Sequence, residues 1–342
     1  MTDALPLSDF DFPEELVASV PAEPRDSARL MVLGRTDGKV DHKLFRDLPS
    51  LLRDGDCLVL NETKVIPCRL LGRKATGGKV ELLLVRELEK GLWSGLATGL
   101  KAGMRLSFPG GLDAVVEGRN DDGEYLIRFD RAELPAYLAE HGHAPLPPYI
   151  LKRKRTPDQS DRDRYQTVYA LTSGSIAAPT AGLHFTPRLL DELRAMGVRL
   201  AKVTLHVGRG TFRPVTVEDA RQHPMLPEHY RMGPEAAELV SRTLREGGRV
   251  MAVGTTSTRA LESLALQAGG FGPGEGWTSL YICPGHEFRA AGGLITNFHL
   301  PRSTPLLLAA AFAGRERLLA AYREACRERY RLYSYGDAML VL

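Results

Sequence analysis

The stretch that decides the fold is residues 177–212, AAPTAGLHFTPRLLDELRAMGVRLAKVTLHVGRGTF. Its middle predicts a short helix, because Thr186 can cap it, Pro187 suits its first turn and leucines follow at helical spacing. Gly197 favours a left-handed stop to that helix. The alternation of apolar and polar side chains over residues 203–207 then predicts a strand.

Two loops of small residues, 178–182 and 208–211, flank this helix and strand, and each borders a histidine, His184 or His206. Small residues let a ligand approach backbone N–H groups closely. Alternatively, either loop is a plain connection in which the glycines serve only the turn. The presence of both loops in one unit favours a ligand site.

The composition is that of a globular protein large enough for two domains. The chain has 342 residues, is 43% hydrophobic and carries a net charge of +3, which permits a polyanionic partner without demanding one. Its four cysteines form no CxxC motif, which is typical of free thiols in a reducing compartment. Residues 1–12 hold no apolar run suited to a signal peptide, and no apolar run is long enough to span a membrane. We therefore expect a cytoplasmic protein.

Strands and helices alternate in both flanks of the chain, which predicts a large α/β domain formed by residues 1–72 and 151–342. Between the flanks, short strands alternate with turn residues at even spacing. This pattern predicts an inserted all-β domain, barrel-like, over residues 73–150. Its predicted strands are 79–85, 92–97, 105–108, 114–118 and 125–129.

Other patterns in the flanks predict particular elements. Residues 42–53 have the apolar spacing of a helix, and 145–150, with three prolines, predicts an extended return to the α/β domain. A strand over 249–253 is expected to lead into a helix over 260–267, and a further strand is expected at 280–283.

Polar side chains follow several of the predicted strands. Glu62 and Thr63 come directly after a strand at 57–60, at the end where α/β sheets bind ligands, although a polar turn explains them equally well. The hydroxyls of residues 255–258 follow a strand and Gly254, which suits an anion or a nucleotide edge; alternatively, they only cap the helix.

Two basic segments are candidates for contact with nucleic acid. The first is the quartet 152–155, which lies close to the mixed charged and aromatic stretch 161–166. The second is a predicted helix over 315–331, whose arginines outnumber its glutamates. A solvated loop and a salt-bridged exposed helix are the respective alternatives. His141 and His143 form an H-x-H pair without further ligands at suitable spacing, which favours a surface turn over a metal site.

Eight longer motifs occur along the chain in a characteristic order. They are Asn61-Glu-Thr-Lys-Val-Ile-Pro67, Pro145-Leu-Pro-Pro-Tyr-Ile150, Asp163-Arg-Tyr-Gln-Thr-Val-Tyr169, Ala178-Pro-Thr-Ala-Gly-Leu-His-Phe185, Thr204-Leu-His-Val-Gly208, Gly254-Thr-Thr-Ser257, Ile295-Thr-Asn-Phe-His-Leu-Pro301 and Tyr335-Gly-Asp-Ala338. In sequence and order they resemble the S-adenosylmethionine:tRNA ribosyltransferase-isomerases of queuosine biosynthesis. The resemblance covers nearly the whole chain.

The resemblance implies a large α/β domain with an inserted β-barrel. It also implies transfer and isomerisation of the ribosyl group of S-adenosylmethionine onto 7-aminomethyl-7-deazaguanine in tRNA, giving epoxyqueuosine-tRNA, adenine and methionine. S-adenosylmethionine is then a consumed substrate, and no further cofactor, metal or membrane is expected. Two alternatives stay open: a non-catalytic tRNA-binding protein of the same fold, and a nucleoside-using transferase that acts on a small molecule.

We assign candidate roles to residues within these motifs and basic segments. The catalytic candidates are His184, His206, His299 and Asp337. The substrate-binding candidates are Glu62, Thr63, Arg164, Gln166, Thr180, Gly182, Gly208, Thr255, Thr256 and Asn297. The candidates for binding tRNA are Lys152, Arg153, Lys154, Arg155 and Arg327.

The chain departs from the family pattern at a few positions. Leu226 stands where many members have a second histidine, whose role His229 could have taken over. Cys283 and His286 stand where tyrosines are common, and Glu62 replaces an aspartate. These departures put local contacts in doubt, and the overall resemblance is unaffected.

Overall fold

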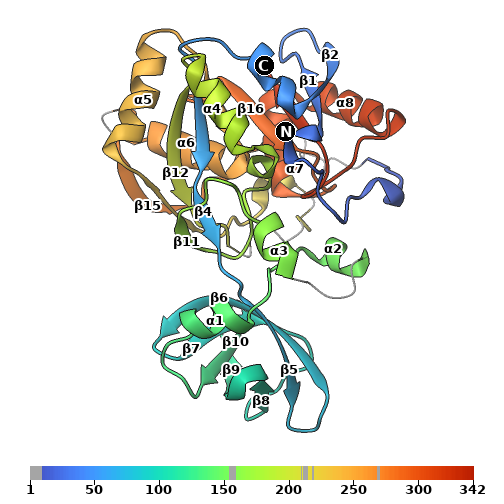
Figure 1. The fold of residues 1–342 in the computed structure, drawn as a ribbon, viewed down its shortest axis with the longest axis vertical. Helices are drawn as coiled ribbons and strands as arrows, with labels where there is room; N and C mark the ends of the chain where they lie inside the picture. The colour runs from blue at the N-terminus through green and yellow to red at the C-terminus, as the bar shows by residue number, and fades with distance from the viewer. Residues whose placement is uncertain (1–9, 154–158, 209, 211–214, 218, 268–269) are drawn as a thin grey trace. The chain divides into compact units, whose positions relative to one another are not determined.

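The computed structural model describes residues 10–153, 159–208, 210, 215–217, 219–267 and 270–342. The chain divides into two compact units. The first contains residues 1–64, 166–172 and 178–342, and the second contains residues 65–165 and 173–177. Each unit is built around its own sheet, and Figure 1 shows both sheets with the chain coloured by residue number.

The first unit contains a nine-stranded mixed sheet. Its strands, in spatial order, are β15 (Gly274–Thr278), β13 (Glu228–Met232), β12 (Arg199–Leu205), β3 (Cys57–Asn61), β14 (Val250–Val253), β16 (Gly293–Asn297), β17 (Ala338–Val341), β1 (Arg29–Leu33) and β2 (Val40–Leu44). The four strands β12, β3, β14 and β16 are neighbours and run parallel. Every side chain of β3 is buried, as expected for a parallel strand covered on both faces.

Helices cover this sheet. They are α4 (Pro187–Ala195), α5 (Pro234–Arg245), α6 (Thr255–Ala265), α7 (Thr304–Ala313) and α8 (Arg315–Arg327). Short 3-10 helices lie at η1 (Glu14–Leu16), η2 (Arg25–Ser27), η3 (Phe45–Ser50), η5 (Thr180–His184) and η7 (Ala220–Gln222). One continuous core joins α4, η3 and η5 to one face of β1, β3, β14, β16 and β17.

The predicted helix at the centre of the chain is confirmed as α4. The Thr186 hydroxyl accepts a hydrogen bond from the Leu189 N–H at 3.2 Å, and Pro187 occupies the first turn. Gly197 follows the helix with a φ of +83°, and a Cβ there would lie 2.1 Å from the Asp54 carboxylate. Glycine is therefore required at that position for two independent reasons.

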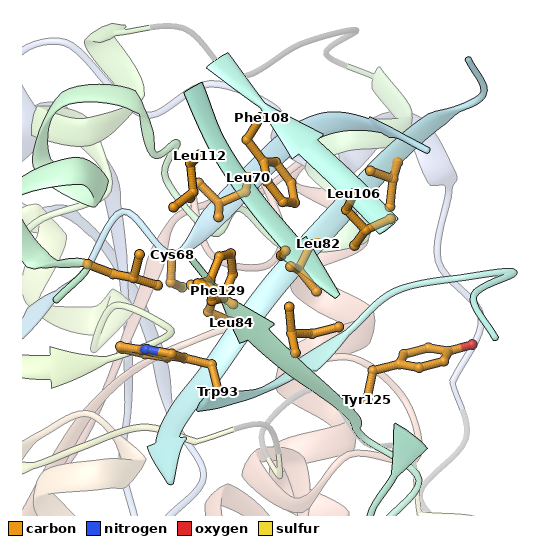
Figure 2. Close-up of a cluster of buried hydrophobic side chains, with 14 of the residues drawn as sticks. Cys68, Leu70, Leu82, Leu84, Trp93, Leu106, Phe108, Leu112, Tyr125 and Phe129 are labelled. Atoms are coloured by element: carbon orange, nitrogen blue, oxygen red, sulfur yellow. The ribbon is translucent and has the colours of Figure 1, made fainter. Parts of the chain in front are cut away.

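The second unit contains a closed antiparallel barrel, which confirms the predicted fold class. Its strands are β10 (Tyr125–Phe129), β7 (Leu92–Leu96), β6 (Lys79–Glu89), β5 (Arg69–Lys74), β8 (Arg105–Phe108) and β9 (Leu112–Arg119). Buried and exposed side chains alternate along β9, where Leu112, Ala114 and Val116 are buried and the residues between them are exposed. Figure 2 shows side chains from these strands packed together in the barrel core.

Three short helices and three shorter elements complete the fold. The helices are α1 (Pro135–His141), α2 (Pro148–Arg153) and α3 (Gln159–Arg164); the shorter elements are η4 (Pro109–Gly111) and the paired strands β4 (Thr63–Val65) and β11 (Thr172–Ser175). The second compact unit, residues 65–165 and 173–177, is longer than residues 73–150 at both ends, and its barrel includes β5. The division into an α/β domain and an inserted domain stays a prediction.

Three local predictions were wrong. Residues 42–53 form the end of β2 followed by the 3-10 helix η3, because Pro49 lacks the N–H that an α-helix needs there. Residues 148–150 begin helix α2, since a proline also suits the first helical turn. Residues 280–283 form no strand. The strand of that region is β15, in which four of the five residues are polar or small, so no apolar pattern marks it.

Candidate active site

The sheet order brings four of the sequence motifs to one edge. β12, β3, β14 and β16 are adjacent and parallel, so their carboxyl ends lie side by side. Directly beyond those ends come His206, Glu62 with Thr63, the Gly254 turn and the segment to His299. The loop of residues 178–184 reaches the same place, since a Cβ built on Gly254 would lie 3.7 Å from that of Ala181.

Asn61, the last residue of β3, joins three of these motifs and was missed as a site residue. Its amide Nδ2 donates to the Leu205 carbonyl and to the Thr256 hydroxyl, both at 3.0 Å. Its Oδ1 accepts from the N–H groups of Leu205 and Thr63, at 3.0 and 3.1 Å. A side chain with two donors and two acceptors at a buried strand end is the signal that could have indicated this role.

His206 is the histidine best placed for acid–base chemistry. Its Nδ1 lies 2.8 Å from the Thr63 hydroxyl, and its ring stacks on that of His229 with 5.9 Å between centroids. Burial first, and the charge of His229 second, lower its pKa, which favours the neutral ring near pH 7. The ring is half-buried, and among the described residues its Nε2 has no recorded partner.

His184 has a different environment. It is 4% exposed, its Nε2 lies 3.2 Å from the Asn297 amide, and its ring packs on Phe45. Burial first, and the charges of Arg331 and Arg25 second, lower its pKa to about 3. The Asn297 amide also donates to the Tyr333 carbonyl, and its oxygen accepts from the Thr180 hydroxyl at 2.8 Å. The neutral ring is therefore a buried acceptor that holds Asn297 and, through it, Thr180.

The depressed pKa of His184 predicts a pH-dependent stability. Because the unfolded chain has the ordinary histidine pKa of about 6.5, it takes up this proton first as the pH falls. The contribution of the neutral ring to the free energy of unfolding is full above about pH 6.5 and is lost as the pH falls toward about 3. Urea titrations of the wild type and His184→Gln across this range should give a flatter pH dependence for the variant, while His141→Gln keeps the wild-type slope. Identical slopes for all three proteins would contradict the prediction.

His299 and Asp337 also lie near this edge with their polar atoms engaged. The His299 Nε2 lies 2.6 Å from the Thr296 hydroxyl, and burial lowers the pKa of the ring. The buried Asp337 carboxylate accepts from the N–H groups of Arg29 and Arg331, at 3.0 and 2.8 Å, and from the Arg331 guanidinium. These contacts join β1 to the turn before β17.

A buried ion pair supports the second small-residue loop. The Glu228 carboxylate accepts from the Gly208 N–H at 2.8 Å and pairs with the Arg259 guanidinium. Arg259 also donates to the Thr278 and Leu280 carbonyls. Glu228 and Arg259 are each less than 10% exposed, so the charges stabilise one another away from water. Sequence patterns gave no indication of this pair, whose members are 31 residues apart.

The hydroxyl cluster forms the first turn of α6 itself, which begins at Thr255, five residues before the predicted start. No side chain caps this helix, because its N-cap residue is Gly254; the Ser257 and Thr258 hydroxyls donate back to the Val253 and Gly254 carbonyls. A cavity of about 20 Å³ lies beside this turn, and Thr255, Thr256, Arg259 and Tyr281 contribute to its lining. An uncapped helix start next to an arginine is suited to a carboxylate or another anion.

Glu62 and Gly182 occupy constrained positions at the same edge. The Glu62 carboxylate lies 3.4 Å from the Lys202 ammonium and 3.5 Å from the Thr204 hydroxyl. A Cβ on Gly182 would lie 2.0 Å from the Tyr169 hydroxyl, so no other residue fits without displacing that ring. Thr63, Thr180, Gly208, Thr255, Thr256 and Asn297 are the other predicted substrate residues gathered here.

The remaining predicted residues belong to other elements. Arg164 ends α3 in the barrel unit, and the Gln166 carbonyl accepts from the Arg25 guanidinium at 2.9 Å. Lys152 is exposed in α2, and Arg153 is the last residue of that helix. The predicted residues Lys154 and Arg155 lie outside the described residues. Arg327 ends α8 with a side chain that is 74% exposed, 3.7 Å from Glu324.

Two of the positions that depart from the family pattern, His286 and Cys283, lie in defined surroundings. The His286 Nε2 lies 3.6 Å from the buried Glu262 carboxylate, which accepts from three backbone N–H groups in residues 289–291. Cys283 is half-buried, and burial raises its pKa.

Within the described ranges, no cluster of three or more His, Cys, Asp or Glu side chains could hold a metal ion. The helices of the described chain are all too short or too polar to cross a membrane.

The fold and the edge geometry define an α/β protein in which loops at the carboxyl ends of parallel strands build a site around a half-buried histidine. Residues 7–341 match the model of the family described as queuosine biosynthesis protein. The chain belongs to the queuosine biosynthesis protein family.

Named relatives cover the chain almost completely. It is 52% identical to a protein of Symbiobacterium thermophilum and 53% identical to one of Anaeromyxobacter sp. (strain K), each over 98% of this chain and 99% of the relative. Both carry the name S-adenosylmethionine:tRNA ribosyltransferase-isomerase. The crystal structure of S-adenosylmethionine tRNA ribosyltransferase from Thermotoga maritima is similar with a TM-score of 0.56 and 37% identity, covering 98% of this chain and 99% of that one.

Proposed function

We propose that this chain transfers and isomerises the ribosyl group of S-adenosylmethionine onto 7-aminomethyl-7-deazaguanine in tRNA. The products would be epoxyqueuosine-tRNA, adenine and methionine. Full-length relatives of this name support the proposal. The observation that carries it is the gathering of four motif loops around His206 at one edge of the sheet. The tRNA substrate and the four unpaired cysteines are consistent with a cytoplasmic protein.

The reaction needs a base, an acid and an oriented pocket. The sulfonium of S-adenosylmethionine acidifies the adjacent ribose carbon, so a base can remove a proton there while the ribose ring opens and adenine leaves. The aminomethyl group attacks as a neutral amine, and methionine departs as the epoxide forms. The sulfonium is its own activating group, and these steps call for no metal or further cofactor.

We assign the proton transfers first to His206. It is half-buried, its Nδ1 is held by Thr63, and no other described residue occupies its Nε2. A positioned acid or base contributes about 10²–10⁴-fold to a rate. His184 instead acts as a positioning residue, because its ring nitrogen is already bonded to Asn297. Asp337 has the same role, since backbone N–H groups and Arg331 occupy its carboxylate. The His299 Nε2 is likewise bonded to the Thr296 hydroxyl, so His299 is also assigned a positioning role.

Other residues at the edge would bind the substrate. The uncapped start of α6, with Thr255 and Thr256, suits the methionine carboxylate. Glu62 and Thr204 are placed for hydroxyl or ammonium groups, since their oxygens face one another beside Lys202. Asn297 and Thr180 would define the wall of the pocket on the β16 side.

Adenine release tests the function directly. The protein is incubated with S-adenosylmethionine and either tRNA that carries the aminomethyl base, tRNA that carries guanine, or the free base. We expect adenine only with the modified tRNA. Binding of that tRNA without adenine release would favour the non-catalytic alternative. Equal release with the free base would favour the small-molecule transferase.

We also propose that residues 152–155 and Arg327 bind the tRNA backbone, which predicts a steep salt dependence. Each phosphate neutralised on duplex regions contributes about −0.9 to the slope of log affinity against log salt. Replacing residues 152–155 by serine should make the slope shallower, while Arg245→Ser, on the exposed side of α5, should leave it unchanged. Filter binding at several salt concentrations measures both. If the slope stays steep after residues 152–155 are replaced, these four residues are not the main contacts with the tRNA backbone.

A further inference from the structure

We propose that the exposed face of β13 and β15 beside His206 is a stacking platform for an unpaired nucleobase of the tRNA, with Trp277 as its principal contact. The inference rests on the proposed function, since the occupant is a nucleotide of the tRNA substrate that flanks the target base. The chain has two tryptophans. Trp93 is 7% exposed inside the barrel, whereas Trp277 is 67% exposed on β15, at the edge of the nine-stranded sheet.

The platform continues directly from the candidate catalytic histidine. The His206 ring stacks on His229 with 5.9 Å between centroids, and the His229 ring meets Trp277 edge to face at 5.4 Å. His229 and Trp277 are paired residues of neighbouring strands, so the backbone register fixes this contact. Trp277 therefore lies two ring contacts from His206, and a target base held at His206 would bring an adjacent nucleotide within reach of the indole.

The two faces of β13 differ sharply. Glu228, Tyr230 and Met232 are buried on one face, while His229 and Arg231 point to the other, where Arg231 is 68% exposed. Their partners on β15, Trp277 and Glu275, are exposed on that same face. An uncovered sheet face that carries an aromatic ring is the arrangement with which sheet-based RNA-binding domains stack unpaired bases.

The charges on this face favour a base over a phosphate. The Glu275 carboxylate lies 3.1 Å from the His229 Nε2 and 3.7 Å from the Arg231 guanidinium, so the charge of Arg231 is already balanced. Phosphate contacts need an excess of positive charge, which this face lacks. A neutral aromatic base can stack on the indole and use the polar edge of Glu275 or Arg231 for hydrogen bonds.

Affinities of Trp277 variants for two RNA probes test the platform. The probes are a tRNA-derived hairpin with an unpaired loop and a fully paired duplex of equal length, both measured without S-adenosylmethionine. We expect Trp277→Ala to weaken hairpin binding by at least about tenfold, the effect of losing one base–aromatic stack, and to leave duplex binding unchanged. Trp277→Phe should retain most of the affinity. Val20→Ala, which truncates another exposed apolar side chain, is the matched control.

Three results would overturn the inference. Hairpin affinity of Trp277→Ala could stay within about twofold of the wild type, below the effect of one stacked base. Both probes could weaken equally, which would indicate loss of structure or of general electrostatics. Trp277→Ala could convert a dimer to a monomer with RNA affinity unchanged, which would show that a second copy pairs with the β15 edge. The probes measure RNA binding alone. If the protein released no adenine, that would count against the proposed function, and the affinities of the Trp277 variants would still decide whether the platform exists.

Discussion

Replacing His206 by alanine is expected to lower turnover by at least about 10²-fold, the contribution of one positioned acid or base. The affinity for tRNA should change little, because phosphate contacts dominate it. The melting temperature should also hold, since the ring is half-buried and, among the described residues, Thr63 is its one hydrogen-bond partner. Single-turnover measurements of adenine release at saturating tRNA give the rate, and thermal unfolding gives the stability.

Two further variants separate catalysis from structure. Thr63→Val keeps the size of the side chain and removes the hydroxyl that holds the His206 Nδ1, so it should lower the rate and shift the pH profile without changing tRNA affinity. The control is His42→Ala. His42 lies on β2 and contacts Tyr330 and Glu324, so this variant should behave as wild type. If His206→Ala keeps near-full turnover, or loses it only in proportion to unfolded protein, the histidine has a structural role.

Replacing Glu228 by alanine is expected to have the largest effect on stability. The substitution leaves the Arg259 guanidinium buried without its counter-ion, and breaking a buried ion pair on one side costs about 3–5 kcal/mol. It also removes the acceptor of the Gly208 N–H, so the loop that follows His206 loses its anchor. Urea unfolding should show the loss of stability, and turnover of the folded fraction should fall as well.

The control is an ion pair of the same residue types on the surface. Glu238 and Arg245 on α5 are both more than 60% exposed, so Glu238→Ala should cost at most about 1 kcal/mol. A double variant, Glu228→Leu with Arg259→Met, should regain part of the stability because no unpaired charge remains. Equal costs for Glu228→Ala and Glu238→Ala would show that the buried pair is open to water.

Much of the fold was predictable because its signals are local. The cap at Thr186, the proline after it and the leucines of α4 are all within one short stretch, and they specify the helix wherever it packs. The alternation in β9 likewise identifies a strand with one buried face. The wrong predictions involve signals with two meanings: a proline can extend a chain or begin a helix, as it does in α2.

The sequence by itself indicated the small-residue and hydroxyl loops of the candidate site, since each lies at the end of a predicted strand or the start of a predicted helix. Only the tertiary structure distinguished the histidines. His184 and His206 have similar sequence neighbourhoods, but the packing of Phe45 and Asn297 buries one, while the other remains half-buried beside Thr63. Burial decides whether an imidazole can exchange protons, and burial depends on long-range contacts.

The same reason applies to the residues that sequence analysis did not single out. Glu228, Arg259 and Trp277 belong to strands and a helix that come together only in the sheet order β15, β13, β12, β3. That order is set by backbone pairing between segments far apart along the chain, and no local pattern encodes it. Local chemistry therefore determined the elements and the kind of site, and the strand order decided which side chains complete it.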